Sequence, residues 1–138
     1  MGRAGLMLAI LLLVLAPATA AADVRYASPL GTGDCSASSP CSLEAAGADV
    51  VLNGHSHDYE RFAKQTAAAV ASPTGIREFV AGTGGRALHS IGTVAANSEV
   101  RIGGRFGVLF MTLHPGSYDW SFRADDGTTL DSGSDDCS

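Results

Sequence analysis

The sequence predicts a mostly β fold in which short strands are joined by glycine-rich loops. Apolar runs recur after residue 47, and each of the longer runs is followed within three residues by a glycine, a pattern typical of strands that end in turns. Glycine accounts for 17 of the 138 residues. The only helix-like stretch, residues 66–71, is shorter than two helical turns. A chain of this length is expected to form one domain.

Composition and charge narrow the class of protein. Hydrophobic residues make up 46% of the chain, which argues against intrinsic disorder. The formal net charge is -5 and Lys64 is the only lysine. Since binding to nucleic acid depends on neutralising phosphates, we expect no nucleic-acid partner. The chain also has no polybasic stretch that would favour an acidic membrane surface.

Residues 1–22 have the pattern of a secretory signal peptide. Arg3 precedes an unbroken apolar run at residues 6–15, and small residues at Ala18 and Ala20 form a cleavage site. Cleavage is expected after Ala20 or after Ala22. The apolar run is about half of the roughly 20 residues that a spanning helix needs, so no stable membrane span is expected after cleavage. The predicted location is therefore secreted, either extracellular or periplasmic.

Residues 23–46 form a turn-rich N-terminal segment with a short strand expected at residues 24–26. Because export permits disulfides, Cys35 and Cys41 are candidates for a small bridged loop. Cys137 is then left over near the end of the sequence. An odd cysteine in a secreted protein indicates a free thiol, an intermolecular bond or a partner outside this chain.

The strands expected from residue 47 onward follow one another along the chain. Tyr118, Trp120 and Phe122 alternate along one of them, which is typical of side chains that pack into a core from one face of a sheet. Pro115 and Gly116 precede this strand and favour a hairpin. The expected strands are residues 49–52, 76–81, 106–113, 117–123 and 128–131.

One group of residues has chemistry suited to a site. Gly54-His55-Ser56-His57 follows an apolar strand, and the end of a strand can hold side chains rigidly at a sheet edge. Neutral imidazole binds zinc, iron and similar ions. Asp58 or Glu60 could accept hydrogen bonds from the imidazole N–H groups. A His-x-His pair alone more often marks two loop histidines, so the surrounding residues decide the interpretation.

Those surrounding residues resemble a known family. The sequence GADVVLNGHSHDYER at residues 47–61 closely resembles the Gly-His-x-His block of the calcineurin-like metallophosphoesterases. It is especially similar to the Gly-His-x-His-x-Tyr-Glu-Arg form of the purple acid phosphatase branch. Residues 75–86, 106–120 and 131–133 resemble later blocks of that branch in the same order. The resemblance covers residues 47–138, the C-terminal part of a metallophosphoesterase domain.

The resemblance implies a fold and a reaction. The fold would be the αββα sandwich of the α/β class, with this fragment supplying mostly strands. The reaction would be metal-dependent hydrolysis of phosphate esters by two divalent or trivalent ions, iron, zinc or manganese, that clamp the phosphate. His55 and His57 would be the catalytic residues, each as a ligand to one ion. The rim of the site would be formed by Asn53, Gly54, Asp58, Tyr59 and Arg61.

The chain departs from the family pattern upstream of these histidines. The family has an Asp-x-His block, a Gly-Asp block, an Asn-His block and a further histidine there, whereas in residues 23–46 the aspartates Asp23 and Asp34 are isolated and no histidine occurs. Catalysis by this chain alone is therefore expected to be weak or absent. The alternative is a non-catalytic secreted module that binds a metal or a partner. An incomplete sheet would also expose a strand edge and favour self-association.

The N-terminal segment resembles a different family. Residues 24–35 and 39–43 are similar to the opening of secreted right-handed β-helix proteins. Two resemblances in one chain place a join at residues 44–47. That join is consistent with a fusion, an internal deletion or an incorrectly assembled gene.

Overall fold

The computed structural model describes residues 24–28 and 30–138. The predicted signal peptide and its two cleavage sites lie outside these described residues. Across the described ranges, no helix is long and apolar enough to cross a membrane.

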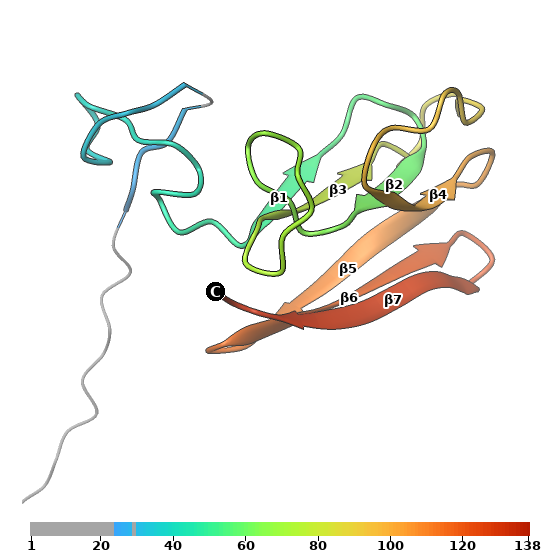
Figure 1. Ribbon diagram of the computed structural model, residues 1–138. Helices are drawn as coiled ribbons and strands as arrows, with labels where there is room; N and C mark the ends of the chain where they lie inside the picture. The colour runs from blue at the N-terminus through green and yellow to red at the C-terminus, as the bar shows by residue number, and fades with distance from the viewer. Residues whose placement is uncertain (1–23, 29) are drawn as a thin grey trace, which may run out of the picture.

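The strands form two sheets that lie one above the other (Figure 1). In the first sheet the order is β1-β3-β2-β4, and β1 runs parallel to β3 while the other neighbours are antiparallel. The second sheet is an antiparallel meander of order β5-β6-β7. The strands are β1 (Val50–Asn53), β2 (Tyr59–Phe62), β3 (Arg77–Ala81), β4 (Ser98–Ile102), β5 (Gly107–Leu113), β6 (Ser117–Ala124) and β7 (Thr129–Asp136).

The predicted α/β class, the αββα sandwich, is wrong for this chain. The described residues contain strands, bridges and turns but no helix, so the fold is all-β with two sheets. Residues 66–71 form a turn closed by a hydrogen bond from Thr66 N–H to the Val70 carbonyl, 2.9 Å long. Parallel strands usually need a helical crossover. Here the link between β1 and β3 contains β2, which pairs with the far side of β3 and takes the place of a helix.

Several strands differ from the sequence-based expectation. Residues 24–26 do not form a strand, and the backbone nearby makes only an isolated bridge between Ala27 and Cys41. The last strand continues to Asp136, well past the expected end at residue 131. β2 and β4 were not predicted, because their charged residues interrupt any apolar run.

Aromatic side chains from both sheets form the core. Tyr59, Phe79 and Phe122 are fully buried, and Tyr118 and Trp120 are nearly so. The rings of Tyr59 and Phe122 stack with centroids 4.0 Å apart, which joins β2 to β6 across the interface between the sheets. The predicted alternation on β6 is confirmed, because its aromatic residues all face this core.

A layer of charged groups lies beside the aromatic core. The carboxylate of Asp131, on β7, accepts hydrogen bonds from Tyr59 Oη at 2.6 Å, Arg61 Nε at 2.8 Å and Trp120 Nε1 at 3.1 Å. Burial by itself would raise the pKa of Asp131, but these hydrogen bonds and the charge of Arg61 outweigh it and hold the pKa below its usual value. The result is a polar clamp that ties β2 to β6 and β7.

A second clamp repeats this arrangement nearby. Arg77, on β3, forms ion pairs with Asp135 and with Glu99, and it also donates to the Phe62 carbonyl at 2.6 Å. The hydroxyl of Tyr118 donates to Asp135 at 3.1 Å. Burial, reinforced by Asp135, raises the pKa of Tyr118 above its ordinary range. The two clamps hold the sheets together through ion pairs and hydrogen bonds from β2 and β3 to β7.

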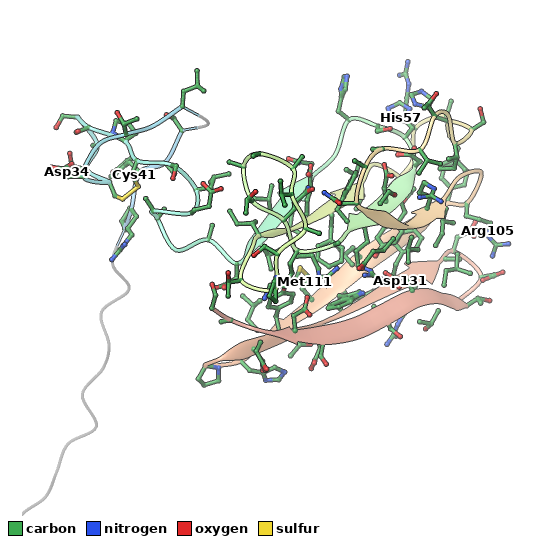
Figure 2. The ribbon with its side chains drawn as sticks, in the orientation of Figure 1. Asp34, Cys41, His57, Arg105, Met111 and Asp131 are labelled. Atoms are coloured by element: carbon green, nitrogen blue, oxygen red, sulfur yellow. A yellow bond between two sulfur atoms is a disulfide. The ribbon has the colours of Figure 1, made fainter. Side chains whose placement is uncertain are left out.

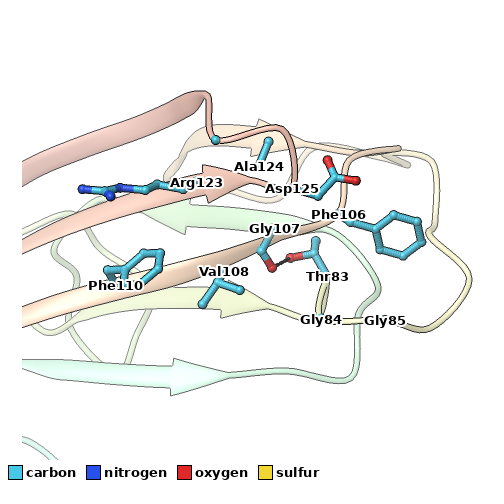
Figure 3. A pocket seen from close by; sticks show the side chains of 11 residues that line it. Thr83, Gly84, Gly85, Phe106, Gly107, Val108, Phe110, Arg123, Ala124 and Asp125 are labelled. Atoms are coloured by element: carbon cyan, nitrogen blue, oxygen red, sulfur yellow. Dashed lines mark hydrogen bonds between the residues drawn. The ribbon is translucent and has the colours of Figure 1, made fainter.

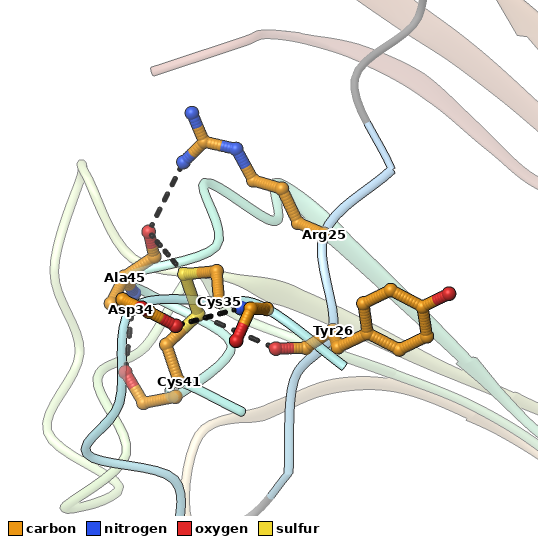
Figure 4. Close-up of a disulfide and its surroundings, with 8 residues drawn as sticks. Arg25, Tyr26, Asp34, Cys35, Cys41 and Ala45 are labelled. Atoms are coloured by element: carbon orange, nitrogen blue, oxygen red, sulfur yellow. Dashed lines mark hydrogen bonds between the residues drawn. A yellow bond between two sulfur atoms is a disulfide. The ribbon is translucent and has the colours of Figure 1, made fainter. Parts of the chain in front are cut away.

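The N-terminal segment is a small loop closed by a disulfide between Cys35 and Cys41 (Figure 4). Cys41 is almost completely buried. Backbone hydrogen bonds run from Tyr26 N–H to the Cys35 carbonyl at 2.9 Å and from Cys41 N–H to the Tyr26 carbonyl at 3.1 Å. Cys137 is exposed and has a free thiol.

The Asp131 clamp predicts a large effect of a nearly isosteric substitution. Asp131→Asn removes the charge that faces Arg61, whose side chain is only 13% exposed. We expect a loss of about 3 kcal/mol in the free energy of unfolding, because Arg61 is left partly buried without this counter-charge. Urea denaturation of the purified chain measures this loss. Asp126→Asn is the matched control, since its pair with Arg105 is exposed and exposed ion pairs contribute little to stability. Equal losses in the two variants would contradict the role of the clamp.

The same carboxylate predicts a dependence of stability on pH. Because the folded-state pKa of Asp131 is lowered, its ionisation stabilises the fold above the unfolded pKa of about 3.9, and the contribution is lost as pH falls through the lower folded value. We therefore expect the wild-type chain to lose stability more steeply than Asp131→Asn as pH falls below about 4. Urea titrations between pH 2 and pH 6 give both slopes. Parallel slopes would mean that another group dominates.

Candidate metal site

The two predicted site histidines lie at the carboxyl edge of the parallel pair β1 and β3. Parallel strands end at the same edge, so the loop after β1, which carries the histidines, meets the loop after β3. The loops approach closely at Gly82, where an added Cβ would lie 1.7 Å from the Ser56 carbonyl oxygen. Backbone hydrogen bonds join them from Gly82 N–H to the Asp58 carbonyl at 3.0 Å and from His89 N–H to the His57 carbonyl at 2.9 Å. The site is therefore built by two loops that are bonded together.

His57 is held in one orientation by the backbone of the second loop. Its Nδ1 lies 2.6 Å from the carbonyl oxygen of Ala87. Because a carbonyl can only accept, Nδ1 must carry the proton, which leaves the lone pair of the neutral ring on Nε2. Metal-bound histidines are commonly fixed in this way, with one nitrogen donating to an oxygen and the other facing the ion. Figure 2 shows His57 near the end of the first sheet, away from Asp131.

His89 supports His57 but is not itself suited to bind a metal. The two rings stack with centroids 4.4 Å apart and an interplanar angle of 24°. The backbone N–H of His57 lies 3.4 Å from Nδ1 of His89 and donates to it. This occupies the Nδ1 lone pair, so the neutral ring of His89 carries its proton on Nε2. The sequence offered no signal for this contact, because residues 57 and 89 are brought together by the pairing of β3 with both β1 and β2.

His55 is exposed and sits in a backbone conformation that few residues adopt. Its φ is 72°, in the left-handed region that costs a non-glycine residue on the order of 1 kcal/mol or more. It follows Gly54, at which no atom lies within 4 Å of an added Cβ. The ring of His55 therefore projects from an open turn beside the ordered His57.

The surrounding donor groups do not fit a two-metal centre. Within residues 24–28 and 30–138, no three side chains of histidine, cysteine, aspartate or glutamate come together in a way that could hold an ion. A dinuclear centre needs carboxylate ligands in addition to two imidazoles. Neither Asp58 nor Glu60 is recorded as a hydrogen-bond acceptor for an imidazole: Oδ1 of Asp58 is buried without a partner, and Glu60 accepts from Ser98. Among the described residues, the two imidazoles are thus not joined by a third potential ligand in a group that could hold an ion.

The predicted rim residues divide into two groups. Asn53 lies at the end of β1 and donates to Oε1 of Glu78 at 2.6 Å, and Gly54 and Asp58 belong to the histidine loop. Tyr59 and Arg61 point instead into the sandwich, where both contact Asp131. Their role at the rim stays a prediction, whereas their role in joining the sheets is visible in these contacts.

Comparison with protein-family models, curated proteins and solved structures finds no match to this chain. The similarity to the metallophosphoesterases therefore rests on the sequence blocks around residues 47–138, and the histidine site is interpreted from its own geometry.

Proposed function

We propose that this chain is a secreted, metallophosphoesterase-like protein that binds a single transition-metal ion at His55 and His57 and does not hydrolyse phosphate esters on its own. The observation that carries the proposal is the bond between Nδ1 of His57 and the Ala87 carbonyl. It fixes the tautomer and presents Nε2 as a ready ligand, so the entropy of orienting this ring is already lost before the ion binds. His55, two residues away on a turn, supplies the second imidazole.

Among the described residues no group of three potential ligand side chains forms at the histidines, which supports the non-catalytic part of the proposal. Hydrolysis by two ions requires both to be held a few Å apart so that one oxygen attacks while the other is stabilised. Two imidazoles cannot hold a pair of ions in that way. Phosphate esters are therefore the substrate class that the resemblance implies for a complete site, to which this chain would contribute two ligands.

A second candidate function is the binding of a protein partner. Among the described residues, exposed apolar side chains gather along β5 and near the end of β1, including Val108, Phe110, Leu113 and Leu52. This surface is independent of the histidines and is considered below.

Metal binding can be tested by isothermal titration of the chain with Zn²⁺, Co²⁺ and Ni²⁺. We expect one ion per chain, and we expect His57→Ala and His55→Ala each to weaken binding by about tenfold or more, because each removes one of two ligands. His114→Ala is the matched control, since His114 pairs with Asp119 on the other sheet. His89→Ala should have a smaller effect, because it removes a stacking contact and leaves both ligands. Binding that is unchanged in His55→Ala and His57→Ala would rule out this site.

Hydrolysis can be tested separately with p-nitrophenyl phosphate in the presence of iron, zinc or manganese. We expect the wild-type rate to equal that of His57→Ala, because no carboxylate completes the centre. A metal-dependent rate that is lost in both His55→Ala and His57→Ala would contradict the proposal. That result would mean that this chain does assemble the full set of ligands.

A further inference from the structure

β5 is an edge strand with a free side. The order of the second sheet is β5-β6-β7, so only one side of β5 is paired. Hydrogen bonds join Asp125 N–H to the Phe106 carbonyl and His114 N–H to the Ser117 carbonyl. Because bonding in an antiparallel ladder alternates from residue to residue, the backbone groups of Gly107, Leu109, Met111 and Leu113 point away from β6.

One of these outward-facing positions is already occupied. The hydroxyl of the buried Thr83 donates to the Gly107 carbonyl at 2.9 Å (Figure 3), and the backbone carbonyl of Thr83 accepts from the Gly107 N–H at 3.4 Å. No hydrogen bond within the described part of the chain reaches the outward-facing backbone of Leu109, Met111 or Leu113. A groove of about 400 Å³ runs along this edge and is lined by Leu52, Val108, Leu109 and Met111, among others. The free edge is therefore a short segment centred on Met111.

None of the usual features that discourage pairing is present on this edge. β5 has the sequence GVLFMTL, with no charged residue and no proline. Its pairing with β6 is regular over the whole strand, with no bulge. Natural proteins protect an edge with lysine, proline or a bulge. A regular, uncharged edge of seven residues is therefore suited to pair with another strand.

The apolar side chains beside this edge provide area for an interface. Leu52, Phe106, Val108, Phe110 and Leu113 are between 40% and 78% exposed, which corresponds to on the order of 400 Å² of apolar surface. A standard interface buries roughly 800 Å² on each partner, of which somewhat more than half is apolar. The exposed apolar area on this side is thus close to what one half of a stable dimer requires.

We propose that a second copy of this chain pairs with β5, antiparallel about a two-fold axis at Met111. This register pairs Leu109 with Leu113 of the other copy and Met111 with its own counterpart, so that the unpaired segment is satisfied completely by about six hydrogen bonds. The contact is isologous, since each copy contributes the same segment. The meander becomes a continuous sheet of both copies, and Gly107 keeps its bonds to Thr83. This inference does not depend on the metal site.

The test uses the secreted chain carrying Cys137→Ser, so that the exposed free thiol cannot form an intermolecular disulfide. Sedimentation equilibrium should show a reversible dimer with a dissociation constant on the order of 10 μM. Amide exchange at high protein concentration should slow at Leu109, Met111 and Leu113 together, and the protection should disappear on dilution.

Three variants distinguish pairing at this edge from non-specific association of the chain. Val108→Lys and Val94→Lys change the same residue type at nearly equal exposure, 55% and 54%, but only Val108 lies on β5. Leu113→Pro removes an outward-pointing N–H without touching the ladder to β6, a position at which an edge strand tolerates proline. We expect Val108→Lys and Leu113→Pro to weaken the dimer by about tenfold or more and Val94→Lys to leave it unchanged.

The outcomes decide the proposal. A dimer that weakens in Val108→Lys and Leu113→Pro but not in Val94→Lys supports it. A monomer at all concentrations overturns it, as does a dimer that persists in Leu113→Pro or protects amides elsewhere. Binding of β5 to a foreign extended peptide by a chain that does not dimerise also overturns it and would identify a different partner. Urea denaturation of each variant confirms that it is folded.

Discussion

The carboxylate of Asp131 is the contact on which the arrangement of the two sheets depends. It lies on the second sheet and accepts from Tyr59 and Arg61 of the first sheet and from Trp120 of its own. Among the described residues, five aromatic side chains form the buried core cluster, which is a small apolar core for a sandwich. A buried carboxylate with three donors fixes a single relative position of the sheets, since any sliding would leave a charge unsatisfied. In this fold, polar contacts provide specificity and aromatic packing provides most of the burial.

The clamp and the candidate metal site are coupled through the chain. Tyr59 and Arg61 lie on β2, which directly follows the histidine loop. The contacts that anchor β2 to Asp131 therefore also fix the position of His57 at the end of that loop. The hydrogen bond that His57 Nδ1 donates to the Ala87 carbonyl orients the ring. The C-terminal part of the loop is therefore held by two contacts, one with the core of the sandwich and one with a neighbouring backbone.

Much of the fold could be predicted where local pattern decides it. The apolar runs predicted the positions of β1, β3, β5 and β6, and the alternation of Tyr118, Trp120 and Phe122 predicted which face is buried. β2 and β4 were not predicted because Arg61 and Glu99 interrupt any apolar run; in the structure they form an ion pair with each other, and Glu99 also pairs with Arg77. The α/β class was wrong because it came from a resemblance rather than from helical periodicity, which the sequence does not contain. At the site, the histidine pair was visible in the sequence, but its contacts with Ala87 and His89 arise only from strand pairing.

The parallel pairing of β1 with β3 has a consequence for the order in which the chain acquires structure. β2 and β3 can pair with each other, and β5, β6 and β7 form a meander of sequential neighbours, so these contacts close short loops. The parallel ladder between β1 and β3 can form only after the segment that joins them, which includes β2, has crossed to the far side of β3 and returned. Long-range pairing of this kind is slow relative to hairpin formation. The histidine loop joins β1 to β2, so we expect the candidate site to become ordered only after the meander of β5, β6 and β7 has formed.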